Sequence, residues 1–128
     1  MKGFITHIEQ ETLSNNDYRR VIYTARHSQL VLMSIEPGGE IGEEVHELDQ
    51  FLRFESGEGK VVLDGEETAV EGGDAVLVPE GARHNVINTG SGPLKLYTIY
   101  SPPNHKDGTV EHTKADEYEE RFDGETTE

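Results

Sequence analysis

The side chains of this sequence that are best suited to chemistry are one carboxylate, one amide and two imidazoles: Glu44, Gln50, His46 and His84. The first three lie in the segment 37–59, which reads PGGEIGEEVHELDQFLRFESGEG. If this segment is a strand, residues of equal parity share a face, because side chains alternate between faces. Glu44, His46 and Gln50 then line one face, and His84 can meet them from a neighbouring strand.

This set of oxygen and nitrogen donors is a plausible ligand set for a divalent first-row metal such as Fe, Mn, Ni, Zn or Cu. The chain contains no cysteine, which excludes thiolate ligands and disulfide bonds. One carboxylate leaves a divalent site with net positive charge, which would acidify a bound water or attract an anionic group. We therefore predict one metal site formed by these four residues.

The surroundings of His84 follow a fixed spacing from Gly73 to Asn88, in which Pro79 and Gly81 precede the histidine. An apolar run ends at a Pro-Gly turn, and a second apolar run starts at the histidine. We interpret the glycines and the proline, together with Gly57, as turn residues, and Asn88 as a structural residue whose amide bonds to the backbone. This arrangement predicts a histidine that points inward at the end of a β-barrel.

Short apolar runs separated by glycine-rich turns predict the strands that position these residues. The expected strands are one near Val21 and others at 29–35, 45–54, 60–63, 67–70, 75–78, 84–88 and 94–100. Their spacing is typical of an all-β sandwich or barrel. Met33 and Phe54 are expected in the core, and Tyr97 and Tyr100 on opposite faces of the last strand.

The ends of the chain differ from this pattern. Residues 7–20 are polar and predict a loop or a short turn of helix, and residues 115–128 contain seven acids and one arginine. We expect an N-terminal arm with the first strand at 1–28, a barrel at 29–101 and a C-terminal segment with an acidic tail at 102–128. The remaining histidines, His7, His27, His105 and His112, lie in polar segments and are expected at the surface.

Composition limits the possible partners. The 128 residues include 26 acidic and 11 basic ones, a formal charge of −15 that disfavours nucleic acid and anionic membrane. No apolar run is long enough for a membrane helix, and the first residues do not resemble a signal peptide. We expect a cytoplasmic, soluble protein that acts on a small molecule.

The motif from Gly73 to Asn88 resembles the second conserved motif of the cupins, G-x5-P-x-G-x2-H-x3-N, at every position. The first cupin motif is matched at His46 and at its flanking glycines. Glu44 stands where that motif has its first histidine, and Gln50 stands where it has a glutamate.

The resemblance implies a cupin double-stranded β-helix, a barrel of the jelly-roll type with one divalent metal and often a homodimer. The chain looks most like small single-domain cupins grouped with mannose-6-phosphate isomerase-like proteins. For its function we expect a metal-dependent enzyme, with dioxygenase-like chemistry on a small oxygenated substrate as the leading hypothesis. A metal-dependent sugar isomerase or lyase, and a non-catalytic cupin that binds a sugar or acid, remain alternatives.

Overall fold

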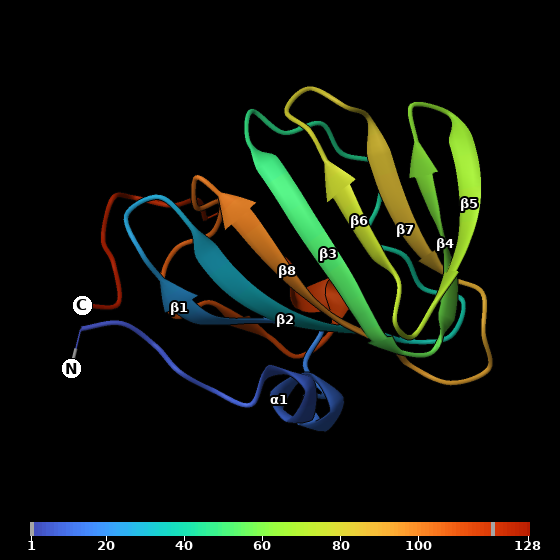
Figure 1. Cartoon of the computed structure of the whole chain (residues 1–128), viewed down its shortest axis with the longest axis horizontal. Coiled ribbons are helices and arrows are strands. Elements are labelled where there is room, and N and C mark those ends of the chain that lie inside the picture. Colours follow the sequence, from blue (N-terminus) through green and yellow to red (C-terminus); the bar gives the residue numbers. More distant parts are fainter. Residues whose placement is uncertain (1, 119) are drawn as a thin grey trace.

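The computed structural model describes residues 2–118 and 120–128, and its strands form two antiparallel sheets (Figure 1). In chain order the elements are α1 (Ile8–Ser14), β1 (Arg19–Thr24), β2 (Gln29–Ile35), β3 (Asp49–Ser56), β4 (Glu58–Leu63), β5 (Glu66–Glu71), β6 (Ala75–Val78), β7 (His84–Asn88), β8 (Leu94–Ser101), β9 (Val110–Glu111) and the 3-10 helix η1 (Lys114–Asp116). The larger sheet has the order β6-β3-β8-β2-β1-β9, and the smaller one the order β5-β4-β7. This arrangement confirms the predicted all-β jelly-roll barrel.

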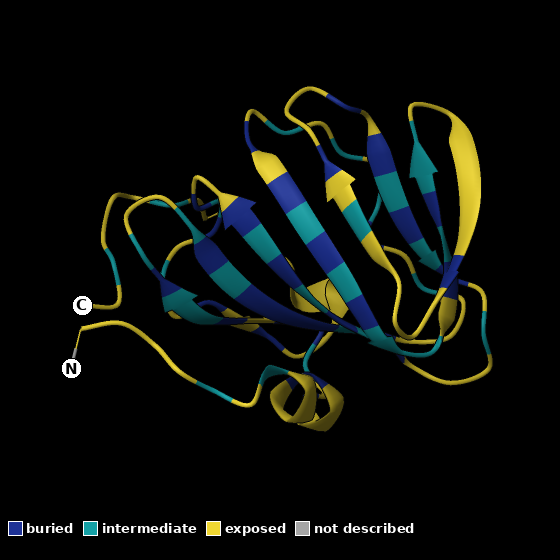
Figure 2. Ribbon diagram, viewed as in Figure 1, coloured by how far each residue is buried: buried dark blue, intermediate teal, exposed yellow. Residues whose placement is uncertain are grey.

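The core lies between the two sheets. Burial alternates along β3 and β8, so that every second side chain points inward (Figure 2). Met33 and Phe54 are fully buried, as the sequence predicts, and Leu52 and Leu96 pack in the same cluster. Complete burial of such a side chain stabilises the fold by roughly 1.5–3 kcal/mol, and this alternation therefore fixes which residues face the interior.

At one end of the strands, polar residues line the interior of the barrel in place of apolar ones. Gln50 on β3 is paired with Tyr100 on β8, and both are almost fully buried. Cross-strand partners in a sheet project to the same face, so the two side chains enter the barrel together. Tyr100 is thus the inward-facing tyrosine of the last strand, and Tyr97 is only partly buried.

The C-terminal segment folds back against the larger sheet through the short strand β9. β9 pairs with β1, where Arg19 lies opposite Glu111, and η1 follows directly. Across residues 2–118 and 120–128, no helix has both the length and the apolar character that a membrane span requires.

Candidate metal centre

Glu44 and His46 lie in the loop between β2 and β3, and this loop runs along β7. Backbone hydrogen bonds join Glu44 to His84 in both directions at 2.8 and 2.9 Å, and Gly81 N donates to His46 O at 2.9 Å. The strand expected from residue 45 therefore begins later, at Asp49, because residues 41–46 bond to β7 and its preceding turn by isolated contacts. These contacts bring both side chains to the histidine of β7.

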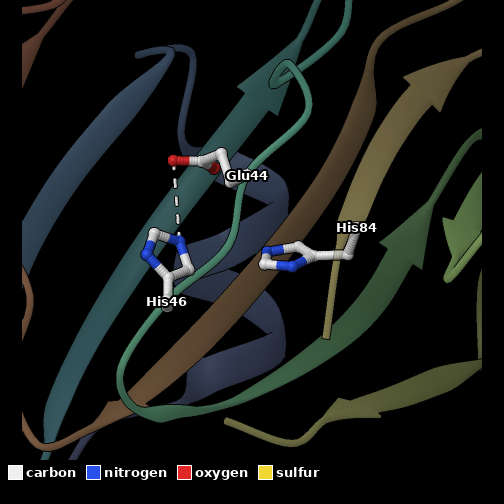
Figure 3. A group of neighbouring side chains, drawn as sticks. All are labelled: Glu44, His46 and His84. Atoms are coloured by element: carbon white, nitrogen blue, oxygen red, sulfur yellow. Dashed lines mark ion pairs between the residues drawn. The ribbon is translucent and has the colours of Figure 1, made fainter. Parts of the chain in front are cut away.

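Three of the predicted ligands form a compact group. The side-chain atoms of Glu44, His46 and His84 that could bind a metal all lie within 4.8 Å of one another. The carboxylate Oε2 of Glu44 is 3.5 Å from Nε2 of His46, and the ring centroids of His46 and His84 are 5.2 Å apart (Figure 3). In Figure 3 the loop carries two of these side chains and β7 the third, and all three converge on one space.

The orientation of His84 is fixed by a hydrogen bond outside this group. Its Nδ1 lies 3.0 Å from the backbone oxygen of Ala82, which can only accept, so Nδ1 carries the proton. The lone pair of Nε2 then faces the group, and this buried atom has no hydrogen-bond partner within the described part of the chain. An imidazole held in this way through its second nitrogen is typical of metal ligands.

Gln50, the fourth predicted ligand, is also held by a hydrogen bond at one end of its side chain. Its amide nitrogen donates to Thr98 Oγ1 at 3.0 Å, which leaves Oε1 buried and unpartnered among the residues described. Its cross-strand neighbour Tyr100 packs edge-on against the ring of His46, with centroids 6.1 Å apart. The amide oxygen is therefore the free end of a side chain that belongs to the same end of the barrel.

These residues fit a divalent ion chemically. Nε2 of His46, Nε2 of His84 and Oε1 of Gln50 are buried and lack hydrogen-bond partners in residues 2–118 and 120–128. A buried polar atom without a partner costs about 1–3 kcal/mol, and three at one end of a barrel call for an explanation. Imidazole nitrogen and amide oxygen, together with the carboxylate of Glu44, are donors that first-row divalent ions accept.

A second polar group, which the sequence analysis did not identify, is formed by His105 and Tyr100 beside the predicted ligands. His105 was expected at the surface but is only 4% exposed, and its Nε2 lies 3.4 Å from the hydroxyl of Tyr100. Burial, with the positive charges of Arg19 and Arg121, lowers the pKa of His105 to about 3, so it is neutral at physiological pH. Burial raises the pKa of Tyr100 to about 12.

The burial of His105 depends on contacts that are distant in the sequence. The side chain of Gln29 on β2 accepts from the backbone nitrogen of His105 at 3.0 Å and donates to its carbonyl oxygen at 2.7 Å. The two residues are 76 positions apart, and no local pattern near His105 reveals this pairing. The neighbouring polar residues alone therefore suggested exposure.

Arg19 is the second residue that sequence analysis missed. It is 2% exposed and pairs with the buried Glu111 and with Glu117, whose oxygen lies 3.1 Å away. It lines a pocket of about 310 Å³ that is also lined by Glu44 and His105. A larger pocket of about 760 Å³, which Tyr18 lines, contains none of the three grouped residues.

The structural role predicted for Asn88 is confirmed. Its amide nitrogen donates to the carbonyl oxygens of Ile35 and Gly92, and its Oδ1 accepts from Gly90 N at 2.9 Å. These bonds tie β7 to the end of β2 and to the turn before β8. The amide of Asn88 therefore serves the backbone at this end of the barrel.

Known proteins resemble this chain in sequence and in fold. A family model described as the cupin domain matches residues 31–100, more than half of the chain. The uncharacterized protein YrkC of Bacillus subtilis (strain 168) is 47% identical over 122 residues, which are 90% of this chain and 66% of YrkC. The chain thus spans about two thirds of that relative's length.

Solved structures agree with this assignment. The crystal structure of BH2720 from Bacillus halodurans superposes with a TM-score of 0.88 at 47% identity, covering 90% of this chain and 92% of that one. KdgF from Halomonas sp. has a TM-score of 0.64 at 19% identity, over 79% of this chain and 94% of its own, and shares the fold alone. With the family model matched over both histidine-bearing segments, the chain belongs to the cupin family.

Proposed function

We propose that the protein is a metal-dependent enzyme in which Glu44, His46, Gln50 and His84 bind one divalent ion and present it to a small oxygenated molecule. The observation that carries this proposal is the set of three buried ligand atoms, Nε2 of His46, Nε2 of His84 and Oε1 of Gln50, that have no hydrogen-bond partner among the described residues. The close approach of Glu44 to both histidines supports the same site.

Each residue of the site would have a separate role. The backbone oxygen of Ala82 holds His84 in one tautomer, and Thr98 orients the amide of Gln50. Glu44 brings the only negative charge of the set, so a divalent ion would keep a net positive charge toward the ligand. When bound, such an ion supplies Lewis-acid or redox chemistry to an oxygenated substrate.

Oxygenase-type chemistry is the first candidate because it requires only the ligand set and room for a chelating substrate. Isomerase or lyase chemistry is the second candidate, and one observation favours it. The ring of Tyr100 lies edge-on to His46, and its hydroxyl is 3.4 Å from Nε2 of His105. Because burial raises the pKa of Tyr100 to about 12, this phenol stays protonated and can donate a hydrogen bond to a substrate oxygen.

Oxygen consumption by the metal-loaded protein distinguishes these chemistries. We expect uptake that depends on an added diketone, phenolic or flavonoid-like chelator and that is lost in His84→Ala. His112→Ala removes a histidine at the surface and serves as the matched control, with unchanged uptake. Absence of uptake across this panel would overturn the oxygenase assignment and leave the isomerase or a simple binding protein.

A further inference from the structure

The pocket beside Glu44 is formed mainly by residues outside the segment that the family model matches. Of the residues that line this pocket, Arg19 comes from β1, and His105, Glu117, Tyr118 and Arg121 come from the chain after β8. The barrel thus contributes the metal-ligand group, and the two ends of the chain contribute the wall next to it. Features of this wall can therefore select the molecule that reaches the group.

The wall is held in place by the rest of the protein. Lys114 Nζ donates to the backbone oxygen of Ile41 at 2.7 Å, three residues before Glu44. The nitrogen of Tyr118 donates to Glu111 at 3.1 Å, and His105 forms an isolated bridge with Arg121. The C-terminal segment is therefore fixed against the loop that carries the ligands.

Arg19 keeps hydrogen-bonding capacity beyond its ion pairs. Both of its contacts to Glu111 and Glu117 use the single nitrogen Nη1, and its buried Nε has no partner within the described residues. A guanidinium has five N–H donors in a planar fork that matches a carboxylate. A buried arginine that lines a pocket is suited to bind an anionic group through this fork.

The charges around the pocket favour an anion once a metal is bound. Glu117 is paired with Arg19 and Lys114, and Glu43 lies 3.5 Å from Arg83. Glu44 is the remaining carboxylate of the lining, and a divalent ion would reverse its charge. Arg19 and Arg121 both line this pocket together with His105, so the two guanidiniums contribute positive charge to the same space.

We propose that this pocket binds the carboxylate of a small organic acid through Arg19 and Arg121, with the adjacent oxygen of the acid directed toward Glu44, the member of the ligand group that lines the pocket. The volume of about 310 Å³ is at the lower end for ligand sites and suits a compact molecule. This proposal rests on the proposed metal-dependent function and names the class of substrate for it.

Three pairs of probes test the carboxylate directly: lactate against propylene glycol, pyruvate against hydroxyacetone, and malate against butanetriol. In each pair only carboxylate groups are replaced by CH₂OH. Binding to protein loaded with Co²⁺ is measured by titration calorimetry and by the cobalt absorption spectrum, after the metal content has been determined separately. We expect at least one acid to bind about tenfold or more tighter than its alcohol, the effect of one charged hydrogen bond.

Variants show whether the arginines provide that preference. Arg121→Gln is exposed and should fold normally, and Arg19→Lys keeps the charge that the buried Glu111 needs. We expect each variant to weaken acid binding about tenfold with unchanged metal content. Arg20→Gln is the matched control, because Arg20 is the next residue of β1 and its side chain is 56% exposed.

The outcomes separate this proposal from the proposed function. Full metal content with equal binding of acids and alcohols, or with acid binding unchanged in Arg121→Gln and Arg19→Lys, would overturn the carboxylate site and leave the metal centre intact. Failure of the protein to retain Co²⁺ would overturn both.

Discussion

At the scale of single residues, the proposed metal centre is marked by buried polar atoms that make no hydrogen bond within the described part of the chain. His84 and Gln50 each use one end for a fixed contact to the protein, and the other end is buried without a partner among the described residues. Such an arrangement costs stability unless a ligand completes it. We therefore interpret these side chains as selected for an ion.

The buried His105 makes stability depend on pH. Its pKa is about 3 in the folded protein and 6.5 in the unfolded chain, so the unfolded state binds more protons between these values. We expect the free energy of unfolding to decrease as the pH falls from 6.5 toward 3, by an amount on the order of a few kcal/mol. Urea unfolding at several pH values measures this slope.

Two variants assign the slope to this residue. His105→Gln should show a shallower decrease than the wild type, because it removes the group that must be protonated. His112→Gln is the control, since Asp17 raises the pKa of His112, and this effect has the opposite sign. An unchanged slope in His105→Gln would contradict the assignment.

At the scale of elements, the sequence predicted the regular strands well and the ligand loop less well. The strands at 29–35, 75–78 and 84–88 have the predicted bounds, because apolar alternation and glycine turns mark both ends. The loop before β3 has no such signal, and its contacts with β7 are tertiary. Parity still placed Glu44 and His46 together, since the bridge between Glu44 and His84 keeps the backbone locally extended.

The turn between β3 and β4 requires a glycine. Gly57 has φ +99°, and a Cβ atom there would lie 2.6 Å from the carbonyl oxygen of Pro93. We expect Gly57→Ala to reduce the free energy of unfolding by about 1–3 kcal/mol, through backbone strain and this clash. Gly92→Ala is the control, because a Cβ there meets no heavy atom within 4 Å and the change should stay within about 0.5 kcal/mol. Equal melting temperatures for both variants would contradict this account.

At the scale of the whole molecule, the N- and C-terminal parts are joined by the buried pair of Arg19 and Glu111, beside the pocket that Arg19 shares with Glu44. Both side chains are almost inaccessible to solvent. The residues of this pair lie outside the part matched to the family model, and their contact is between distant positions, so the sequence alone did not reveal it. The homodimer implied by the resemblance stays a prediction, which sedimentation measures.

Removal of one partner of this pair should strongly destabilise the protein. Among the described residues, Glu111→Ala leaves Arg19 with Glu117, whose side chain is 35% exposed, as its ion-pair partner, and we expect a loss of about 3 kcal/mol in the free energy of unfolding. Glu67→Ala breaks the exposed pair with Lys60 and should cost less than about 1 kcal/mol. Similar denaturant midpoints for the two variants would show that the buried pair has no special role.

The most direct test of the metal centre is elemental analysis of the purified protein, before and after incubation with Fe²⁺, Mn²⁺, Ni²⁺ or Zn²⁺ and removal of unbound ion. We predict about one divalent ion per chain, and loss of that ion in His84→Ala with the circular dichroism spectrum of the folded barrel retained. A wild-type protein that takes up none of these ions, or a His84→Ala variant with full metal content, would contradict the account.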